Sequence, residues 1–154
     1  LRTSAVFDRE TKFTYNICIR VADQAGRTYD KNFVITVNNL NEPPTNISLS
    51  NNAVDENQPL NTLVGVLTAA DPDASASFTY SLACAIPGAN DASFNILAAS
   101  LRTSVIFDFE TKSTYNICIR VTDQGGLTYD KNFVITISNI SQEVPPTYLP
   151  IIFR

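Results

Sequence analysis

The chain has 154 residues, 44% of them hydrophobic, and a formal net charge of −4. This length supplies a core for one small domain plus a fragment, and the scattered Lys and Arg residues argue against binding of nucleic acid or anionic membranes. Histidine is absent, which excludes Ser-His-Asp and Cys-His nucleophile systems and imidazole metal ligands, so an enzyme is disfavoured.

The chain repeats itself at a spacing of 100 residues. Residues 1–40 and 101–140 are identical at 30 of 40 positions. A repeat of this length with strand-like content predicts an array of small β domains. We therefore expect the C-terminal half of one repeat over residues 1–41, a complete repeat over 42–141, and a tail over 142–154.

The ends of the chain carry few targeting signals. No charged-then-apolar segment opens the sequence, which begins with Leu, so we expect an N-terminus produced by processing or cut from something longer. The longest apolar runs are too short to cross a bilayer, so no membrane span is expected.

The half-repeat predicts two strands whose apolar residues lie on one face. Tyr15, Ile17 and Ile19 alternate with polar residues in the first strand, as do Phe33 and Ile35 in the second. About forty residues cannot bury a core alone, so this face needs a cover. Either the protein continues upstream, or another copy completes the fold.

The complete repeat predicts a series of short strands and no long helix. They are expected at residues 47–50, 63–68, 78–82, 94–97, 101–106, 115–121 and 133–137, where β-branched and aromatic residues recur between turn signals. Six or seven short strands in about one hundred residues suit a sandwich of two sheets.

A joint is expected between the two repeats, at Asn38-Asn39-Leu40-Asn41-Glu42-Pro43-Pro44. Consecutive prolines prevent ladder hydrogen bonding and Asn favours turns, so the chain leaves one sheet here and enters another. Its counterpart at residues 138–146 is longer and altered, as expected of a terminal repeat.

Acidic motifs occur at set points along the repeat. They are Val54-Asp55-Glu56-Asn57, Asp71-Pro72-Asp73, Phe107-Asp108-Phe109-Glu110, Val121-Thr122-Asp123-Gln124-Gly125 and the joint itself. In this order and at this period they resemble cadherin-type repeats, specifically the bacterial cadherin-like form of long surface proteins. The resemblance covers residues 1–140 and implies an all-β, Greek-key, seven-stranded cadherin-like (immunoglobulin-like) β-sandwich, repeated in tandem.

The resemblance also implies Ca²⁺ between successive repeats. The implied ligands are Asp8 and Glu10 of the upper repeat, Glu42 with Asn39 or Asn41 of the joint, and Asp71, Asp73 and Asp123 of the lower repeat. Calcium takes about six to eight oxygen ligands, and carboxylates that converge without a cation repel one another. The alternative is that these acids are solvated turn residues and caps.

Departures from the vertebrate pattern reduce the expected number of ions. Asn39 replaces the first Asp of the vertebrate joint and Pro43 replaces its last Asn, so one or two weakly bound ions are expected. Glu56, Asp108, Glu110 and Glu143 would form the matching half-site at the far end, which we expect to be vestigial.

Three cysteines occur, at positions 18, 84 and 118, and Cys18 and Cys118 share one repeat position. In the sandwich that the sequence resembles, the strands with Cys84 and Cys118 are neighbours, which implies a disulfide and an oxidising, extracellular address. Simple alternation points Cys84 to the core face, so a bulge near Ala83 would be needed. Three buried or idle thiols are the alternative. The partner of Cys18 would lie before residue 1.

The tail is apolar and β-prone. Its candidate assembly residues are Tyr148, Leu149, Ile151, Ile152 and Phe153. Added as a strand to a neighbour's incomplete domain, the tail would give head-to-tail filaments. The alternatives are that it packs on its own domain, that it frays, or that it anchors or sorts the protein, as similar Arg-ended tails of some bacterial secreted proteins do.

The leading functional hypothesis is an extracellular or cell-surface adhesive module, stiffened by calcium and assembled into a fibre or stalk. Its expected partners are other copies of itself or neighbouring repeats. The main alternative is a passive spacer of a large secreted enzyme or adhesin whose active domain lies elsewhere. Carbohydrate binding is a weaker hypothesis, because only Tyr29 and Tyr129 recur as candidate stacking aromatics.

Overall fold

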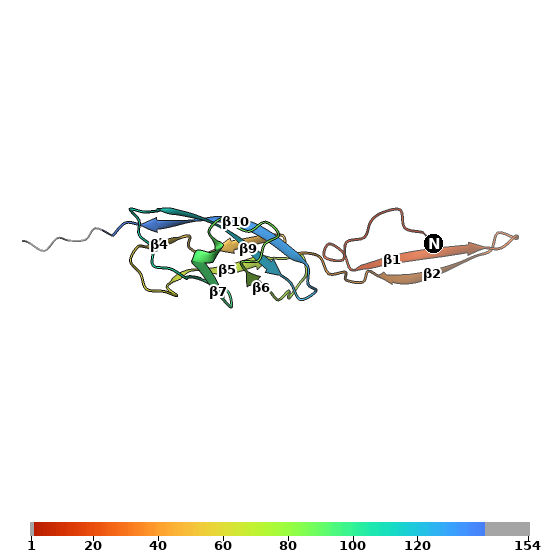
Figure 1. The fold of residues 1–154 in the computed structure, drawn as a ribbon. Coiled ribbons are helices and arrows are strands. Elements are labelled where there is room, and N and C mark those ends of the chain that lie inside the picture. Colours follow the sequence, from red (N-terminus) through yellow and green to blue (C-terminus); the bar gives the residue numbers. More distant parts are fainter. Residues whose placement is uncertain (1, 141–154) are drawn as a thin grey trace, which may run out of the picture.

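The computed structural model describes residues 2–140, which form two units in series, a hairpin followed by a sandwich (Figure 1). The strands are β1 (Thr14–Ala22), β2 (Thr28–Thr36), β3 (Asn46–Leu49), β4 (Ala53–Asp55), β5 (Leu63–Ala70), β6 (Thr79–Ser81), β7 (Phe94–Leu97), β8 (Ser100–Thr103), β9 (Thr114–Thr122) and β10 (Thr128–Ser138). The expected assembly residues Tyr148, Leu149, Ile151, Ile152 and Phe153, and Glu143, lie outside the described residues.

The described part of the chain is all-β, as expected. One 3₁₀ turn, η1 (Asp91–Ser93), precedes β7. Within residues 2–140, no helix has the length and apolar character needed to cross a membrane.

The sandwich consists of two four-stranded sheets with the orders β4-β10-β9-β6 and β3-β5-β8-β7. The first strand is divided between them, because β3 pairs antiparallel with β5 whereas β4 pairs parallel with β10. The sequence pattern predicts a single strand in this region, at residues 47–50, and does not predict β4. This division is why the sandwich has one strand more than the six or seven expected.

The core lies between the two sheets. Its most buried side chains from β9 and β10 are fully inaccessible to solvent, namely Ile117, Ile119, Val121, Ile135 and Ile137. They share one face of the hairpin because side chains of a strand alternate between faces. Ile47 and Leu101, from the other sheet, are equally buried and complete the same cluster.

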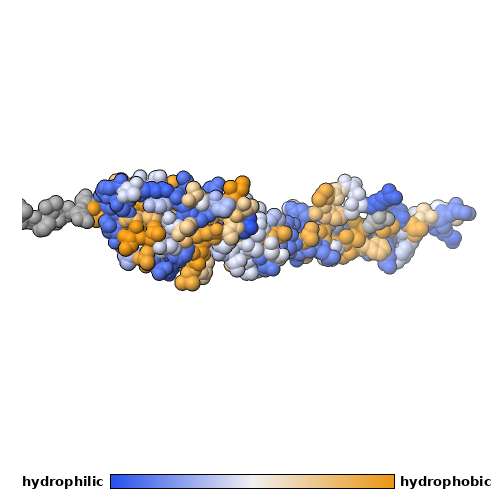
Figure 2. All heavy atoms as spheres, in the orientation of Figure 1, coloured by the Kyte–Doolittle hydropathy of each residue, from blue (hydrophilic) through white to orange (hydrophobic). Residues whose placement is uncertain are grey.

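The β1–β2 hairpin has the same register as β9–β10, but within residues 2–140 no second sheet covers it. Thr14 pairs with Thr36 as Thr114 pairs with Thr136. Ile19 and Val21 are 45% and 60% exposed, although their counterparts in β9 are fully buried. Hydrophobic side chains are therefore visible on the surface of this unit in Figure 2.

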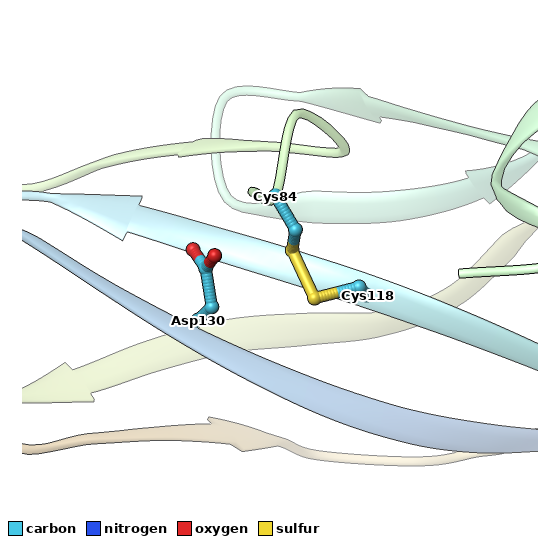
Figure 3. A group of neighbouring side chains, drawn as sticks. All are labelled: Cys84, Cys118 and Asp130. Atoms are coloured by element: carbon cyan, nitrogen blue, oxygen red, sulfur yellow. A yellow bond between two sulfur atoms is a disulfide. The ribbon is translucent and has the colours of Figure 1, made fainter. Parts of the chain in front are cut away.

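Cys84 and Cys118 are joined by a disulfide, as the resemblance implied. The expected bulge near Ala83 is wrong in its position and form, because β6 already ends at Ser81 and the following loop carries Cys84. This loop lies over the outer face of β9, where Cys118 is 3% exposed (Figure 3). The outward direction of Cys118 is thus compatible with burial and pairing.

The loop between β6 and β7 also satisfies the edge of β9 beyond the short β6. The Asn90 side chain accepts the Asn116 N–H, and the Asp91 carboxylate accepts the Cys118 N–H at 2.8 Å. Gly88 lies so close that a Cβ there would be 2.5 Å from the Cys118 nitrogen. Side chains and a glycine therefore replace a paired strand at this edge.

The two copies of the hairpin provide a matched pair of positions for measuring how much the second sheet contributes to stability. Ile119→Ala is expected to lower the free energy of unfolding of the sandwich by about 2–5 kcal/mol, because it leaves a cavity in a closed core. Ile19→Ala should change this free energy by less than about 1 kcal/mol, because Ile19 is 45% exposed and belongs to the separate β1–β2 sheet. Chemical denaturation of both variants measures the difference, and equal losses would contradict the burial comparison.

Candidate metal centre

The candidate site lies where the linker after β2 enters the sandwich. This linker is held by two nearly buried carboxylates, Asp73 and Asp123, each 7% exposed. Asp73 accepts the Asn39 side-chain amide at 2.6 Å and the Glu42 backbone N–H at 2.9 Å. Asp123 accepts the Asn41 side-chain amide at 2.7 Å. Linker and sandwich are thus joined by charge-assisted hydrogen bonds.

Three carboxylates from different parts of the chain converge at this linker. Oxygens of Glu10, Glu42 and Asp73 lie within 4.8 Å of one another. Glu10 lies in the turn before β1, Glu42 belongs to the linker, and Asp73 follows β5. The fold therefore brings one acid from the half-repeat, one from the joint and one from the complete repeat to a common point.

The surroundings of Glu42 in this cluster disfavour its ionised, negatively charged form. Desolvation raises the pKa of Glu42 above its ordinary value, and repulsion from Glu10, Asp73, Asp8 and Asp71 raises it further. Such a shift means that the ionised form is disfavoured in the folded state.

Two buried carboxylate oxygens at the joint have no hydrogen-bond donor within residues 2–140. They are Oε2 of Glu42 and Oδ2 of Asp71. The other oxygen of Asp71 accepts the Asp73 N–H at 2.9 Å, so this side chain is already fixed. Buried acceptors without donors are costly, and a cation would satisfy both.

The remaining expected ligands are engaged in the local structure. Hydrogen bonds from the Thr11 side chain and backbone hold the pKa of Asp8 below its usual value. For Asp123, burial opposes ionisation, but hydrogen bonds from Asn41, Leu127 and Gly125 outweigh it and lower the pKa. Asp8 and Asp123 therefore stay ionised while they stabilise turns.

The two joint asparagines present nitrogen, rather than oxygen, to the sandwich carboxylates. Asn39 would need to turn its amide to offer Oδ1 to a cation, and that oxygen now accepts the Arg9 guanidinium at 3.2 Å. Asn41 is held on both sides, since its Oδ1 accepts the Gln124 amide at 2.7 Å. Of the expected ligands, Glu10, Glu42 and Asp73 therefore already have oxygens close together, and Asp71 adds a buried oxygen without a donor within residues 2–140.

Two residues that hold the joint were not singled out as functional from the sequence. Gln124 anchors Asn41, and a Cβ on Gly125 would be 2.5 Å from the Asn41 amide nitrogen. The one available signal is the position of both residues next to Asp123 in the acidic motif.

The far end of the sandwich has a similar group of acids. Oxygens of Glu56, Asp108 and Glu110 also lie within 4.8 Å of one another. Glu56 is 3% exposed, and its two oxygens accept the backbone N–H groups of Phe109 and Ile140. The group is therefore tied into the domain, and its expected fourth member, Glu143, lies outside the described residues.

A third group of potential ligands surrounds the disulfide. Cys84, Cys118 and Asp130 meet within the same distance limit of 4.8 Å (Figure 3). Metal ligation by cysteine requires the thiolate, so the disulfide excludes this group as a metal centre.

Comparison with known proteins identifies relatives over nearly the whole chain. A cadherin-domain family model matches residues 50–138. Protocadherin-16 of Mus musculus is 31% identical over 157 residues, which covers 97% of this chain and 5% of the relative. Cadherin-1 of Gallus gallus is 29% identical over 163 residues, covering 96% of this chain and 18% of the relative. The chain thus spans a small part of either relative.

Solved structures agree with the sequence comparison. Chicken VE-cadherin EC1-2 is 26% identical with a TM-score of 0.58, covering 85% of this chain and 70% of that chain. These relatives are animal proteins, so the comparisons support the family implied by the motifs and do not support its bacterial form.

The raised pKa of Glu42 gives a prediction for the calcium-free protein. Because its folded pKa lies above the unfolded value of about 4.3, ionised Glu42 destabilises the fold, and this loss develops as pH rises through the folded pKa. Glu42→Gln is expected to raise the melting temperature in chelator at pH 7, with a smaller gain at pH 4. Asp55→Asn, at an exposed site outside the cluster, is the charge-matched control. Equal stabilisation by both variants would indicate a net-charge effect.

Proposed function

The chain belongs to the cadherin family, and from this premise we propose that it is an adhesive repeat module whose joint is stiffened by calcium. Members of this family are adhesion proteins rather than enzymes, and the module lies outside the cell or at its surface. The chain spans only part of its relatives, so the adhesive role of the whole protein is part of the proposal.

One observation carries the calcium proposal. Glu10, Glu42 and Asp73 converge from three segments, while oxygens of Glu42 and Asp71 remain buried without donors. A cluster of like charges with unsatisfied acceptors favours a hard, oxygen-seeking cation. When bound, Ca²⁺ supplies the positive charge that the described side chains do not.

The side chains of the joint then act as a clamp. Glu10 belongs to the half-repeat and Asp73 to the sandwich, so shared ligation restrains one unit relative to the other. Asp73 already fixes Asn39 and the Glu42 backbone. The Asn41–Asp123 hydrogen bond holds the next turn of the linker. Neutralising the cluster removes the repulsion that opposes this arrangement, which is how a flexible linker becomes a rigid joint.

Neighbouring repeats are the proposed partners of the module. Assembly with other copies through the tail is a second candidate, and the uncovered apolar face of β1–β2 favours it. A strand donated to this face would bury more of Ile19 and Val21, which are now 45% and 60% exposed. A passive spacer role is the alternative to adhesion.

The clamp predicts a calcium-dependent change at the linker. Leu40 is 78% exposed in the linker and offers a cleavage site for chymotrypsin. Calcium is expected to slow this cleavage in the wild-type chain, and Glu10→Gln with Glu42→Gln should abolish the protection. These two carboxylates are suitable targets because their side chains make no hydrogen bonds within the described residues.

The matched control is Glu110→Gln, the position equivalent to Glu10 in the second copy of the repeat. It should leave protection at Leu40 unchanged, because Glu110 lies in the far-end group with Glu56 and Asp108. Isothermal titration of the same variants measures calcium binding directly. Retained protection in the double variant would refute the joint site.

Tail-mediated assembly is tested by ending the chain after Pro146. Loss of filaments in electron microscopy, with the unfolding transition and the Cys84–Cys118 disulfide retained, is the expected result if the tail is the donor strand. Filaments that persist without the tail would reject this mode of assembly and leave the calcium proposal untouched.

A further inference from the structure

The outer face of the β1–β2 hairpin repeats a docking surface that is used in the complete repeat. In the complete repeat, this surface consists of Cys118 and Asp130, and the loop between β6 and β7 lies on it (Figure 3). Cys118 bonds to Cys84, and the Asp130 carboxylate accepts the Ala85 N–H at 3.0 Å. One covalent bond and one charge-assisted hydrogen bond thus fix neighbouring loop residues.

The same groups are present in β1–β2 without a loop. Cys18 is exposed and carries a free thiol. Arg20 donates two hydrogen bonds to Asp30, both with N···O distances of 2.7 Å. In the complete repeat, the equivalent N···O distances between Arg120 and Asp130 are 2.7 and 2.8 Å. The carboxylate is therefore already oriented as in the complete repeat. The groups that recognise the loop are preformed.

The aromatic residues on the inner face of the hairpin give independent evidence that a segment packs here. In the complete repeat, Phe94 packs against Phe107 and Tyr115 with ring centroids 5.3 and 6.0 Å away. Phe7 and Tyr15 form the equivalent pair in the half-repeat, with centroids 4.7 Å apart, and no third ring joins them there.

A cavity of about 180 Å³ lies at this place, beside Phe7 and Tyr15 and also lined by Ile17 and Ile35. An apolar cavity of about 150 Å³ is large enough for benzene. The half-repeat therefore has room for one aromatic side chain where the complete repeat holds Phe94.

We propose that β1–β2 is the docking site for a segment that carries a cysteine and, ten residues later, a phenylalanine, and that Cys18 forms a disulfide with that cysteine. The spacing is that of Cys84 and Phe94, which lie 17 and 7 residues before Leu101, the counterpart of Leu1. The segment belongs to the same repeat as β1–β2 and precedes Leu1. This proposal does not depend on calcium at the joint.

The chemistry of the two faces selects this occupant over the others. The tail has an aromatic residue, Phe153, but no cysteine, so it cannot bond to Cys18. In a second copy of the chain, Cys84 is already bonded to Cys118, and the remaining thiol, Cys18, is followed ten residues later by Thr28 instead of a phenylalanine. A segment of the same repeat reaches both faces at once, as the residues from Cys84 to Phe94 do in the sandwich.

Formation of the bond is a two-electron oxidation. The two thiols lose two protons and two electrons, which reduce a small-molecule disulfide such as oxidised glutathione to two thiols. An extracellular location supplies such an oxidising environment.

The test completes the half-repeat with the chain's own sequence. A second copy of residues 42–100 placed directly before Leu1 gives β1–β2 the same upstream sequence that β9–β10 has. Non-reducing peptide mapping by mass spectrometry is expected to pair Cys18 with the added cysteine, and the free thiol should disappear. Cys18 left free, or bonded between chains, while Cys84–Cys118 forms normally would overturn the proposal.

The unextended chain gives a second, independent measurement. A synthetic peptide with the sequence of residues 78–97 is equilibrated with it in a glutathione buffer, and the mixed disulfide at Cys18 is quantified. The peptide should react several-fold more than its Gly88→Leu form, because a side chain at Gly88 would collide with the edge of the docking strand. Asp30→Ala in the chain should remove this preference. Equal yields for both peptides would mean that Cys18 reacts as an ordinary exposed thiol.

Discussion

The structure depends on covering one face of a two-stranded hairpin. The same sequence pattern occurs twice, and the isoleucine at the third apolar position is fully buried in one copy and 45% exposed in the other. Propensity, register and the Arg–Asp cross-strand pair are shared by both copies, so they are not what buries this residue. The second sheet does that, and burial of an apolar side chain of this size contributes about 1.5–3 kcal/mol.

The joint follows a different physical rule from the core. Here acids are gathered, and the fold compensates for their charge only in part, through amides of Asn39 and Asn41 and backbone N–H groups. Glu42 and Asp71 keep oxygens without donors, and repulsion contributes to the raised pKa of Glu42. These unsatisfied oxygens are the basis of the proposal that a cation stiffens the linker.

The cysteines relate the two copies covalently. In the sandwich, the disulfide fixes a loop to the outer face of β9, where β6 is too short to pair. The hairpin has Cys18 and Asp30 at the equivalent positions, and a cavity beside Phe7 and Tyr15. The complete repeat is therefore the template for the proposed segment. It supplies the two residue types, a cysteine and a phenylalanine, and the ten-residue spacing between them.

The repeat, the all-β class, the acidic motifs and the approximate places of the sandwich strands other than β4 could be predicted from the sequence, because strand alternation has a period of two and turn residues act locally. The Cys84–Cys118 pairing came from the family resemblance. The pairing of β4 with β10 and the end of β6 before Cys84 depend on the three-dimensional fold. So do the convergence of Glu10, Glu42 and Asp73 and the role of Asp8 and Asp123 in turns. Those outcomes depend on hydrogen bonds between residues far apart in the sequence, such as that from Asn41 to Asp123, which no local pattern encodes.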